Sequence, residues 1–150
     1  TSGNTSTLIE LGTDSEAVNK SSQPYVFIAF APSQFISIGK YTNNNNADGA
    51  FVPTLSSLGV PLQPVFVLTK TLASANWFIN DVARIGYNVD NNSLFPNTTG
   101  AEATADVMDI VTGGFKLRTA LDPNYQTATT IYMAIGTPII DTDGRIIAGR

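Results

Sequence analysis

The sequence predicts an all-β protein with the architecture of an antiparallel β-sandwich. Short apolar runs rich in β-branched and aromatic residues recur along the 150 residues, as expected for strands buried between two sheets. Clusters of Asn, Asp, Gly and Pro, which favour turns, separate these runs. Only 13% of the residues are charged and 43% are hydrophobic, whereas an average protein has about 25% charged residues. This composition excludes a disordered chain and a long amphipathic helix built from Glu and Lys.

Six segments are expected as strands, because turn formers bound each of them and β-forming residues dominate their composition. Most are short apolar runs, which is typical of strands buried in a sandwich. Residues 115–119 instead alternate strictly between apolar and polar side chains, which predicts a strand with one solvated face. In chain order, the expected strands are residues 25–31, 34–39, 64–69, 76–80, 115–119 and 130–135.

Residues 102–111 allow more than one interpretation. A short helix around residues 104–111 would end at Gly113-Gly114, because glycine is common just past a helix end. In an all-β domain the same residues suit a connecting turn or a further strand. A helix would place Asp106 and Asp109 on one face, where they are expected as two solvated acids and not as a catalytic pair.

The chain contains an internal similarity at an offset of 105 residues. Aligning Ala29 with Ala134 (134 − 29 = 105) pairs residues 26–30 with residues 131–135, and it pairs Asn19 with Asn124. One explanation is chance, because β-hairpins share composition. The other is a tandem array. The array would divide the chain into a terminal hairpin at residues 1–31 from the end of a preceding repeat, a β-sandwich domain at residues 32–136, and a C-terminal hairpin or extension at residues 137–150.

The composition excludes several classes of function. A formal net charge of −4 removes the electrostatic attraction on which most nucleic-acid binding depends. Without cysteine or histidine, the chain has no disulfide, zinc finger, thiol nucleophile or Ser-His pair. No apolar run reaches the roughly 18–20 residues that cross a bilayer. We therefore expect no enzyme, no catalytic or metal-binding residue, no cofactor, no nucleic-acid partner and no membrane insertion.

Four residues are candidates for binding a carbohydrate, although none belongs to a specific motif. Trp77 is the single tryptophan, and an exposed aromatic ring can stack on a sugar. Within its apolar run, however, Trp77 is expected to pack in the core. Tyr87 and the loop residues Asn44 and Asn45 complete the set. A buried Trp77, without another groove lined by aromatic residues, would argue against sugar binding.

Seven short sequence segments carry a resemblance to a known family through their order and spacing: residues 29–32, 35–42, 45–52, 64–70, 76–84, 114–118 and 130–135. Together they resemble a β-sandwich domain that recurs in virion and tail-fibre proteins of tailed bacteriophages, notably marine ones. The resemblance covers about residues 25–136. It implies a sandwich of jelly-roll, concanavalin-like or SPRY-like shape that occurs in tandem and has no catalytic motif. At residues 64–66 the family tends to have a Pro-Arg-Trp-like motif, whereas this chain has Pro-Val-Phe, which keeps the apolar pattern.

The resemblance implies a non-enzymatic structural protein of a bacteriophage virion. It would belong to a tail fibre or a similar appendage, with a head-decoration protein as the close variant. The expected partners are copies of itself, in a homo-oligomer, and other virion proteins. The expected location is the extracellular particle, which is assembled in the cytoplasm of the bacterial host. The alternative is a carbohydrate-binding or adhesin module that recognises glycans on the host surface.

Overall fold

The computed structural model of the chain describes residues 9, 20–84, 88, 92–104, 106–141 and 143–145. The chain divides into two compact units, Thr1–Phe30 and Ala31–Arg150. All strands of the described residues belong to the second unit, which is the domain discussed below.

The described part of the chain contains strands and no helix, which confirms the all-β prediction. Five of the six expected strands are present, with bounds shifted by a few residues. The strands are β1 (Ile36–Thr42), β2 (Phe51–Pro53), β3 (Leu62–Thr71), β4 (Trp77–Asp81), β5 (Asn92–Ser93), β6 (Ala103–Thr104), β7 (Met108–Val111), β8 (Gly114–Leu117) and β9 (Thr129–Pro138).

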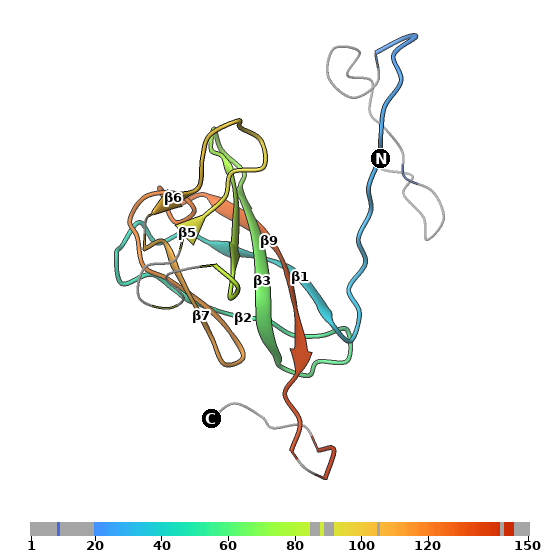
Figure 1. Ribbon diagram of the computed structural model, residues 1–150, viewed down its shortest axis with the longest axis vertical. Helices are drawn as coiled ribbons and strands as arrows, with labels where there is room; N and C mark the ends of the chain where they lie inside the picture. The colour runs from blue at the N-terminus through green and yellow to red at the C-terminus, as the bar shows by residue number, and fades with distance from the viewer. Residues whose placement is uncertain are drawn as a thin grey trace. The chain divides into compact units, whose positions relative to one another are not determined.

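Two antiparallel sheets pack against each other, consistent with a β-sandwich (Figure 1). The larger sheet has the strand order β1-β9-β3-β4, so that the last strand of the chain lies between the first and the third. The smaller sheet has the order β2-β8-β7, and β5 and β6 form a separate pair. The long strands β3 and β9 therefore form the centre of the larger sheet and β1 and β4 its edges.

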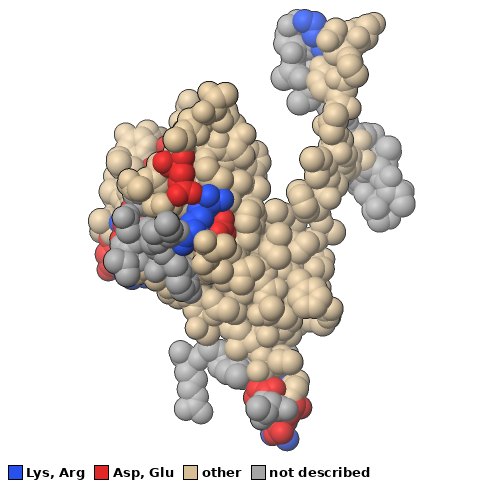
Figure 2. Space-filling model, in the orientation of Figure 1, with Lys and Arg blue, Asp and Glu red and all other residues tan. Residues whose placement is uncertain are grey.

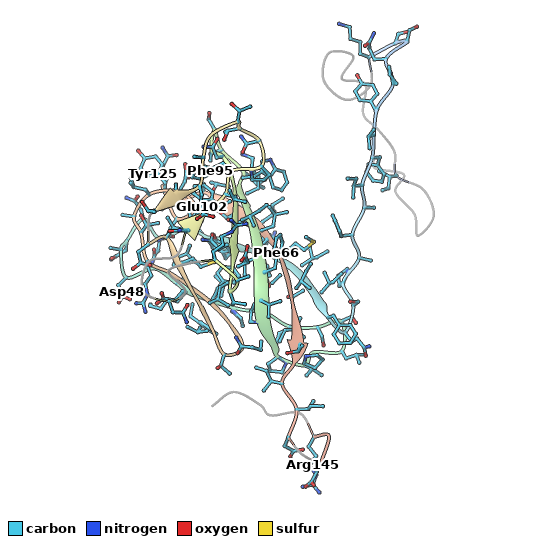
Figure 3. The ribbon with its side chains drawn as sticks, viewed as in Figure 1. Asp48, Phe66, Phe95, Glu102, Tyr125 and Arg145 are labelled. Carbon is cyan, nitrogen blue, oxygen red and sulfur yellow. The ribbon has the colours of Figure 1, made fainter. Side chains whose placement is uncertain are left out.

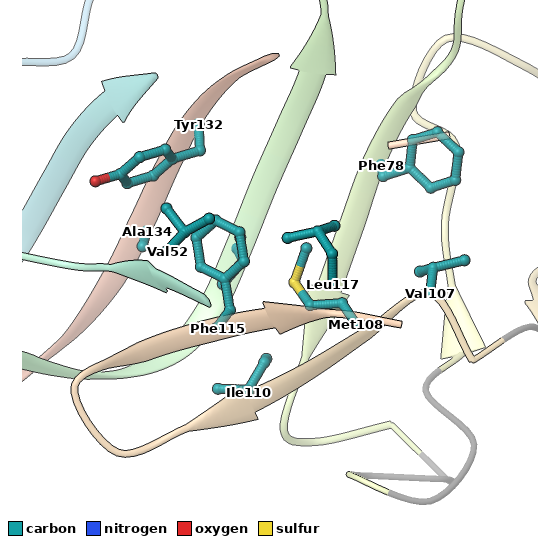
Figure 4. Packing of buried hydrophobic residues seen from close by; sticks show 10 residues of the cluster. Val52, Phe78, Val107, Met108, Ile110, Phe115, Leu117, Tyr132 and Ala134 are labelled. Atoms are coloured by element: carbon teal, nitrogen blue, oxygen red, sulfur yellow. The ribbon is translucent and has the colours of Figure 1, made fainter. Parts of the chain in front are cut away.

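The hydrophobic core lies between these two sheets (Figure 4). Phe115 on β8 and Tyr132 on β9 meet edge to face, with ring centroids 5.4 Å apart, and Tyr41 contacts Phe115 at 5.9 Å. Such edge-to-face pairs join the two layers beyond what burial alone provides. The buried members of the core are Val52, Val67, Phe78, Val107, Met108, Ile110, Phe115, Leu117, Tyr132 and Ala134.

The short helix considered around residues 104–111 is wrong. Residues 108–111 form β7, which pairs with β8 through a two-residue turn at Thr112 and Gly113. Gly113 has a φ of +79°, a left-handed conformation that glycine adopts without steric cost. The two glycines therefore mark a hairpin turn and the start of a strand, because pairing with β8 outweighs the weak helical preference of these residues.

The strand expected at residues 25–31 is also absent. Val26 and Ile28 have side chains that are 92% and 72% exposed, and the backbone of residues 23–33 forms no strand. Nearby, the backbone N–H of Gln23 donates to the Lys20 carbonyl in a turn. A β-forming sequence becomes a strand only when a neighbouring strand supplies hydrogen bonds and packing, and the described residues supply none here.

A turn follows β9 where the sequence has Asp143-Gly144. The backbone N–H of Asp141 donates to the Arg145 carbonyl at 2.8 Å, and Gly144 has a φ of +75°. The Asp141 carboxylate also accepts hydrogen bonds from the N–H groups of Asp143 and Arg145. The acidic side chain in this segment therefore stabilises a turn, as short polar side chains often do.

Candidate functional site

The larger sheet has one face toward the core and one face away from it. Side chains alternate along β4, so Phe78 is buried in the core at 7% exposure, whereas Trp77 on the opposite side is 37% exposed. The expectation that Trp77 packs in the core is therefore wrong, because the next residue, Phe78, takes that position. Phe78 fills the core position, where its ring meets Phe95 edge to face at 4.9 Å.

The register of the four strands arranges the side chains of the other face in three rows. We call these twelve residues the outer face, and nine of them are apolar. The middle row, Ile38, Met133, Leu68 and Ile79, crosses all four strands without a polar side chain. The rows on either side are Ile36, Ile135, Phe66 and Asp81, and Lys40, Ile131, Lys70 and Trp77.

The outer face is accessible in the structure. Ile38, Ile131 and Trp77 are 40%, 38% and 37% exposed, and the other apolar members are half-buried by their neighbours. In Figure 2 one group of charged atoms lies on the left of the domain and another at its lower end, where Figure 3 labels Arg145, and the surface over β3 and β9 between them is uncharged. Figure 3 marks this region with Phe66 on β3. The sheet thus carries a continuous apolar surface that the described part of the chain leaves uncovered.

The Lys70 side chain at the border of the outer face is fixed by backbone carbonyls. Its ammonium group donates hydrogen bonds to the carbonyl oxygens of Thr71, Ala73 and Ala75, at 2.8–3.1 Å. These bonds tie the ammonium to the β3–β4 loop, while the apolar stem of the side chain remains beside Trp77, its partner in the register. Lys70 therefore adds apolar area to the face despite its charge.

A charged cluster occupies the opposite border, at the end of β4. The Arg84 guanidinium lies 2.8 Å from the Asp81 carboxylate and also donates to Glu102, which accepts a second hydrogen bond from Asn92. The bonds from Arg84 and then Asn92 hold the pKa of Glu102 below its usual value. Two carboxylates and one guanidinium leave this border with a net charge of −1.

The loop that holds Asn44 and Asn45 is folded around a buried asparagine. Asn124 is fully buried, and its amide donates to the Asn44 side chain and to the carbonyls of Asn46 and Thr119, each at 2.8–2.9 Å. Asn44 also uses its amide on the Asp48 carbonyl. Both polar atoms of the Asn44 side chain are therefore engaged in holding the loop, which leaves them poorly placed to bind a sugar.

Of the two remaining candidates, Asn45 lies within the described residues, in the loop after β1. Asn45 has a φ of +52° and accepts a hydrogen bond from the Gln126 N–H, so it too has a role in the loop. Tyr87 lies outside the described residues. Of the three described candidates, Trp77 lies on the outer face, whereas Asn44 and Asn45 lie in the loop after β1.

A groove of about 530 Å³ has the residue types of a sugar site and was missed in the sequence. Tyr125, 45% exposed, lines it together with Leu121 and the acids Asp106 and Asp122. Burial raises the pKa of Asp122 above its usual value, and nearby Lys70 opposes this effect. Tyr125 follows Asn124 in a polar loop, and no periodic pattern marks it. Figure 3 shows it well apart from Phe66.

The acids considered at the sequence level have different surroundings. Asp106 is exposed, whereas Asp109 is buried on β7 and its carboxylate pairs with the Arg118 guanidinium, so the expectation of two solvated acids is wrong for Asp109. Among the described residues, no group of three or more acidic side chains is arranged to hold a metal ion. The same residues include no helix long and apolar enough to cross a membrane.

Comparison with known proteins gives one match. A family described as "Domain of unknown function (DUF7483)" matches residues 1–137, which include most of the sandwich and the segment before it. No curated protein and no solved structure matches the chain.

Proposed function

The chain belongs to the DUF7483 family, and we propose that it is a non-enzymatic structural module of a bacteriophage particle that assembles through its outer face. The observation that carries the proposal is the apolar middle row of that face. An antiparallel sheet that faces water normally carries polar side chains on its outer side. Contiguous exposed apolar surface on a folded domain instead marks an interaction site. We therefore assign the outer face to protein–protein contact.

A second copy of the chain is the proposed occupant, because the charges at the rim are self-complementary. Lys40 stands at one corner of the outer face, and Asp81, with its net negative cluster, stands at the diagonally opposite corner. A twofold axis along the other diagonal brings Lys40 of each copy over Asp81 of its partner. The apolar rows then cover each other within a charged rim, which is the usual distribution in protein interfaces.

Assembly is tested by the oligomeric state of the intact chain. Ile131→Lys places a charge on the outer face, and we expect it to weaken association by about 100-fold in sedimentation velocity and light scattering. Leu58→Lys is the matched control, because Leu58 is 74% exposed and lies in a turn outside the face. Circular dichroism checks that both variants fold. A wild-type chain that is monomeric at every concentration, or equal dissociation by both variants, contradicts the proposal.

The phage particle as the setting rests on the sequence resemblance, and the low charge of the chain is compatible with it. The module would belong to a tail fibre or a similar appendage, with head decoration as the close variant, beside other virion proteins. Mass spectrometry of purified phage particles tests this setting. Peptides of this chain should occur in a fixed ratio to known structural proteins, and their absence from intact particles contradicts the setting without affecting the assembly test.

The groove beside Tyr125 favours a second candidate function, binding of a host-surface glycan. An exposed aromatic ring flanked by carboxylates is suited to stack on a sugar and accept hydrogen bonds from its hydroxyls. A glycan array would show binding that Tyr125→Ala removes, whereas Trp77→Ala on the outer face leaves it intact. Absence of binding to any glycan rules out this candidate.

A further inference from the structure

Residues 25–31 form the most exposed apolar segment in the described part of the chain. The segment has no charged residue, and four of its side chains are more than half exposed: Val26 92%, Phe27 66%, Ile28 72% and Phe30 57%. Within the described residues, the backbone of 26–31 makes no hydrogen bond. Six or seven residues of this composition left unpaired invite pairing with another chain, so natural proteins seldom leave them open.

The segment has the sequence of a particular strand of this fold. At the offset of 105 residues it aligns with β9, the strand between β1 and β3. The alternation agrees: Phe27 corresponds to Tyr132 and Ala29 to Ala134, which face the core at 9% and 0% exposure. The three alternate residues correspond to the outer-face members of β9: Val26 to Ile131, Ile28 to Met133 and Phe30 to Ile135.

Two further positions define the limits of the correspondence. Asn19 aligns with Asn124, the buried asparagine that fixes the loop before β9. Ala31 aligns with Gly136, where a Cβ would lie 2.2 Å from the Gln63 carbonyl oxygen. If residues 25–31 pair with a strand equivalent to β3, that strand must lie farther from Ala31 than β3 lies from Gly136, or the pairing must end at Phe30.

We propose that residues 25–30 are the last strand of another domain of this same fold, which precedes the sandwich in the polypeptide. In that domain the segment takes the place of β9 and lies between the counterparts of β1 and β3. Its backbone then has a neighbouring strand on each side, and Phe27 and Ala29 are buried in the core as Tyr132 and Ala134 are. The partner of this segment is thus a preceding domain of the same type. This inference does not depend on the proposed function.

The test adds a domain of this fold before the chain. Residues 32–105 are added directly before the intact chain, so that residues 1–31 stand in the place of residues 106–136 of the added copy. Hydrogen exchange measured by mass spectrometry should show unprotected amides at residues 26–30 in the original chain. In the extended chain the same amides should exchange at least about 100-fold more slowly. Equal exchange in the two chains, with the added residues unfolded, overturns the proposal.

A variant separates specific insertion from nonspecific collapse. Ala29→Lys puts a long charged side chain at the position that corresponds to fully buried Ala134. It should abolish the new protection in the extended chain and leave the thermal unfolding of the original chain unchanged. Val26→Lys is the matched control, because Val26 aligns with Ile131, which is 38% exposed in β9. Loss of protection by both variants alike would contradict the β9 assignment.

A transplant within the existing chain provides a second, independent test. The substitutions Ile131→Val, Tyr132→Phe, Met133→Ile and Ile135→Phe convert the centre of β9 to the sequence of residues 26–30. If the segment is a β9-type strand, this variant should fold and unfold cooperatively in urea, with a lower midpoint. A variant that carries the same five residues one position earlier, at residues 130–134, should not fold, because a phenylalanine then replaces the fully buried Ala134. Failure of the in-phase variant to fold overturns the proposal.

Discussion

The side-chain amide of Asn124 donates a 2.8 Å hydrogen bond to the side-chain oxygen of Asn44, eighty residues away in the sequence. The Asn124 oxygen accepts the backbone N–H of Asn44 in return, at 3.0 Å. Together these bonds join the loop after β1 to the loop before β9 at the end of the sandwich. Asn44 is thus part of a polar network around the buried Asn124, in which each group depends on the others for its hydrogen bonds.

Removal of the Asn124 side chain should destabilise the domain strongly. Asn124→Ala removes a fully buried side chain and leaves the carbonyls of Asn46 and Thr119 without this donor, which we expect to cost about 2–4 kcal/mol in the free energy of unfolding. Urea unfolding measures the loss. Gln34→Ala, at an exposed position, should change the midpoint little. A similar midpoint for both variants would contradict the role of the network.

Gly136 is required by close approach of the backbone. A Cβ at this position would lie 2.2 Å from the Gln63 carbonyl oxygen and 2.9 Å from the Cα of Pro64, and neither atom can move without shifting β3. Gly136→Ala should therefore cost at least about 2 kcal/mol in thermal or urea unfolding. Gly100→Ala is the control, because its Cβ meets only the Thr98 hydroxyl, at 3.5 Å. Equal stability of the two variants would disprove the steric argument.

The sequence predicted the long paired strands, but it missed the short strands β2, β5 and β6 and predicted a strand at residues 25–31, which have no partner among the described residues. Residues 64–69 and 130–135 became the centres of β3 and β9, where each strand has a neighbour on both sides. Residues 25–31 have an equally strong β pattern but form no strand. Strand preference is mainly the preference of a side chain for packing on neighbouring strands, so composition predicts a strand only as well as it predicts its neighbours.

The candidate site was harder to predict, because it depends on phase and register. A strand of apolar residues such as Trp77, Phe78 and Ile79 does not show which side faces the core, and the prediction for Trp77 failed by one residue. The outer face exists only because the register aligns residues from four strands that lie far apart in sequence. The structural role of Asn44 was missed for a related reason, since its partner Asn124 could not be identified from composition.

The Tyr132 hydroxyl should contribute a measurable bond between the sheets. It donates to the Pro53 carbonyl on β2 at 3.1 Å and lies 3.4 Å from the Ser37 hydroxyl. Gly39 leaves room for the ring, because a Cβ there would lie 2.8 Å from the Tyr132 hydroxyl. Tyr132→Phe keeps the ring and removes these bonds, so we expect a loss of about 1 kcal/mol in urea unfolding. Tyr125→Phe, with an exposed ring, should leave stability unchanged.

Two acids should affect the pH dependence of stability with opposite signs. Burial raises the pKa of Asp122 in the folded state, so folding favours its protonated form and stability is lost as pH rises through that pKa. Asp122→Asn should therefore raise the urea midpoint at neutral pH, and the gain should vanish below the unfolded pKa of 3.8. Lys70, whose charge opposes the shift, limits the size of this gain.

Asp48 provides the matched comparison, because a hydrogen bond from Lys116 lowers the pKa of its carboxyl group in the folded state. Its contribution is present above the unfolded pKa and is lost as pH falls through the folded pKa. Asp48→Asn should therefore lower the urea midpoint at neutral pH, and this loss should also vanish in acid. Urea titrations of the wild type and both variants at neutral and acidic pH measure the two effects. Changes of the same sign at neutral pH would show that burial does not control the Asp122 carboxyl, since the two substitutions make the same chemical change.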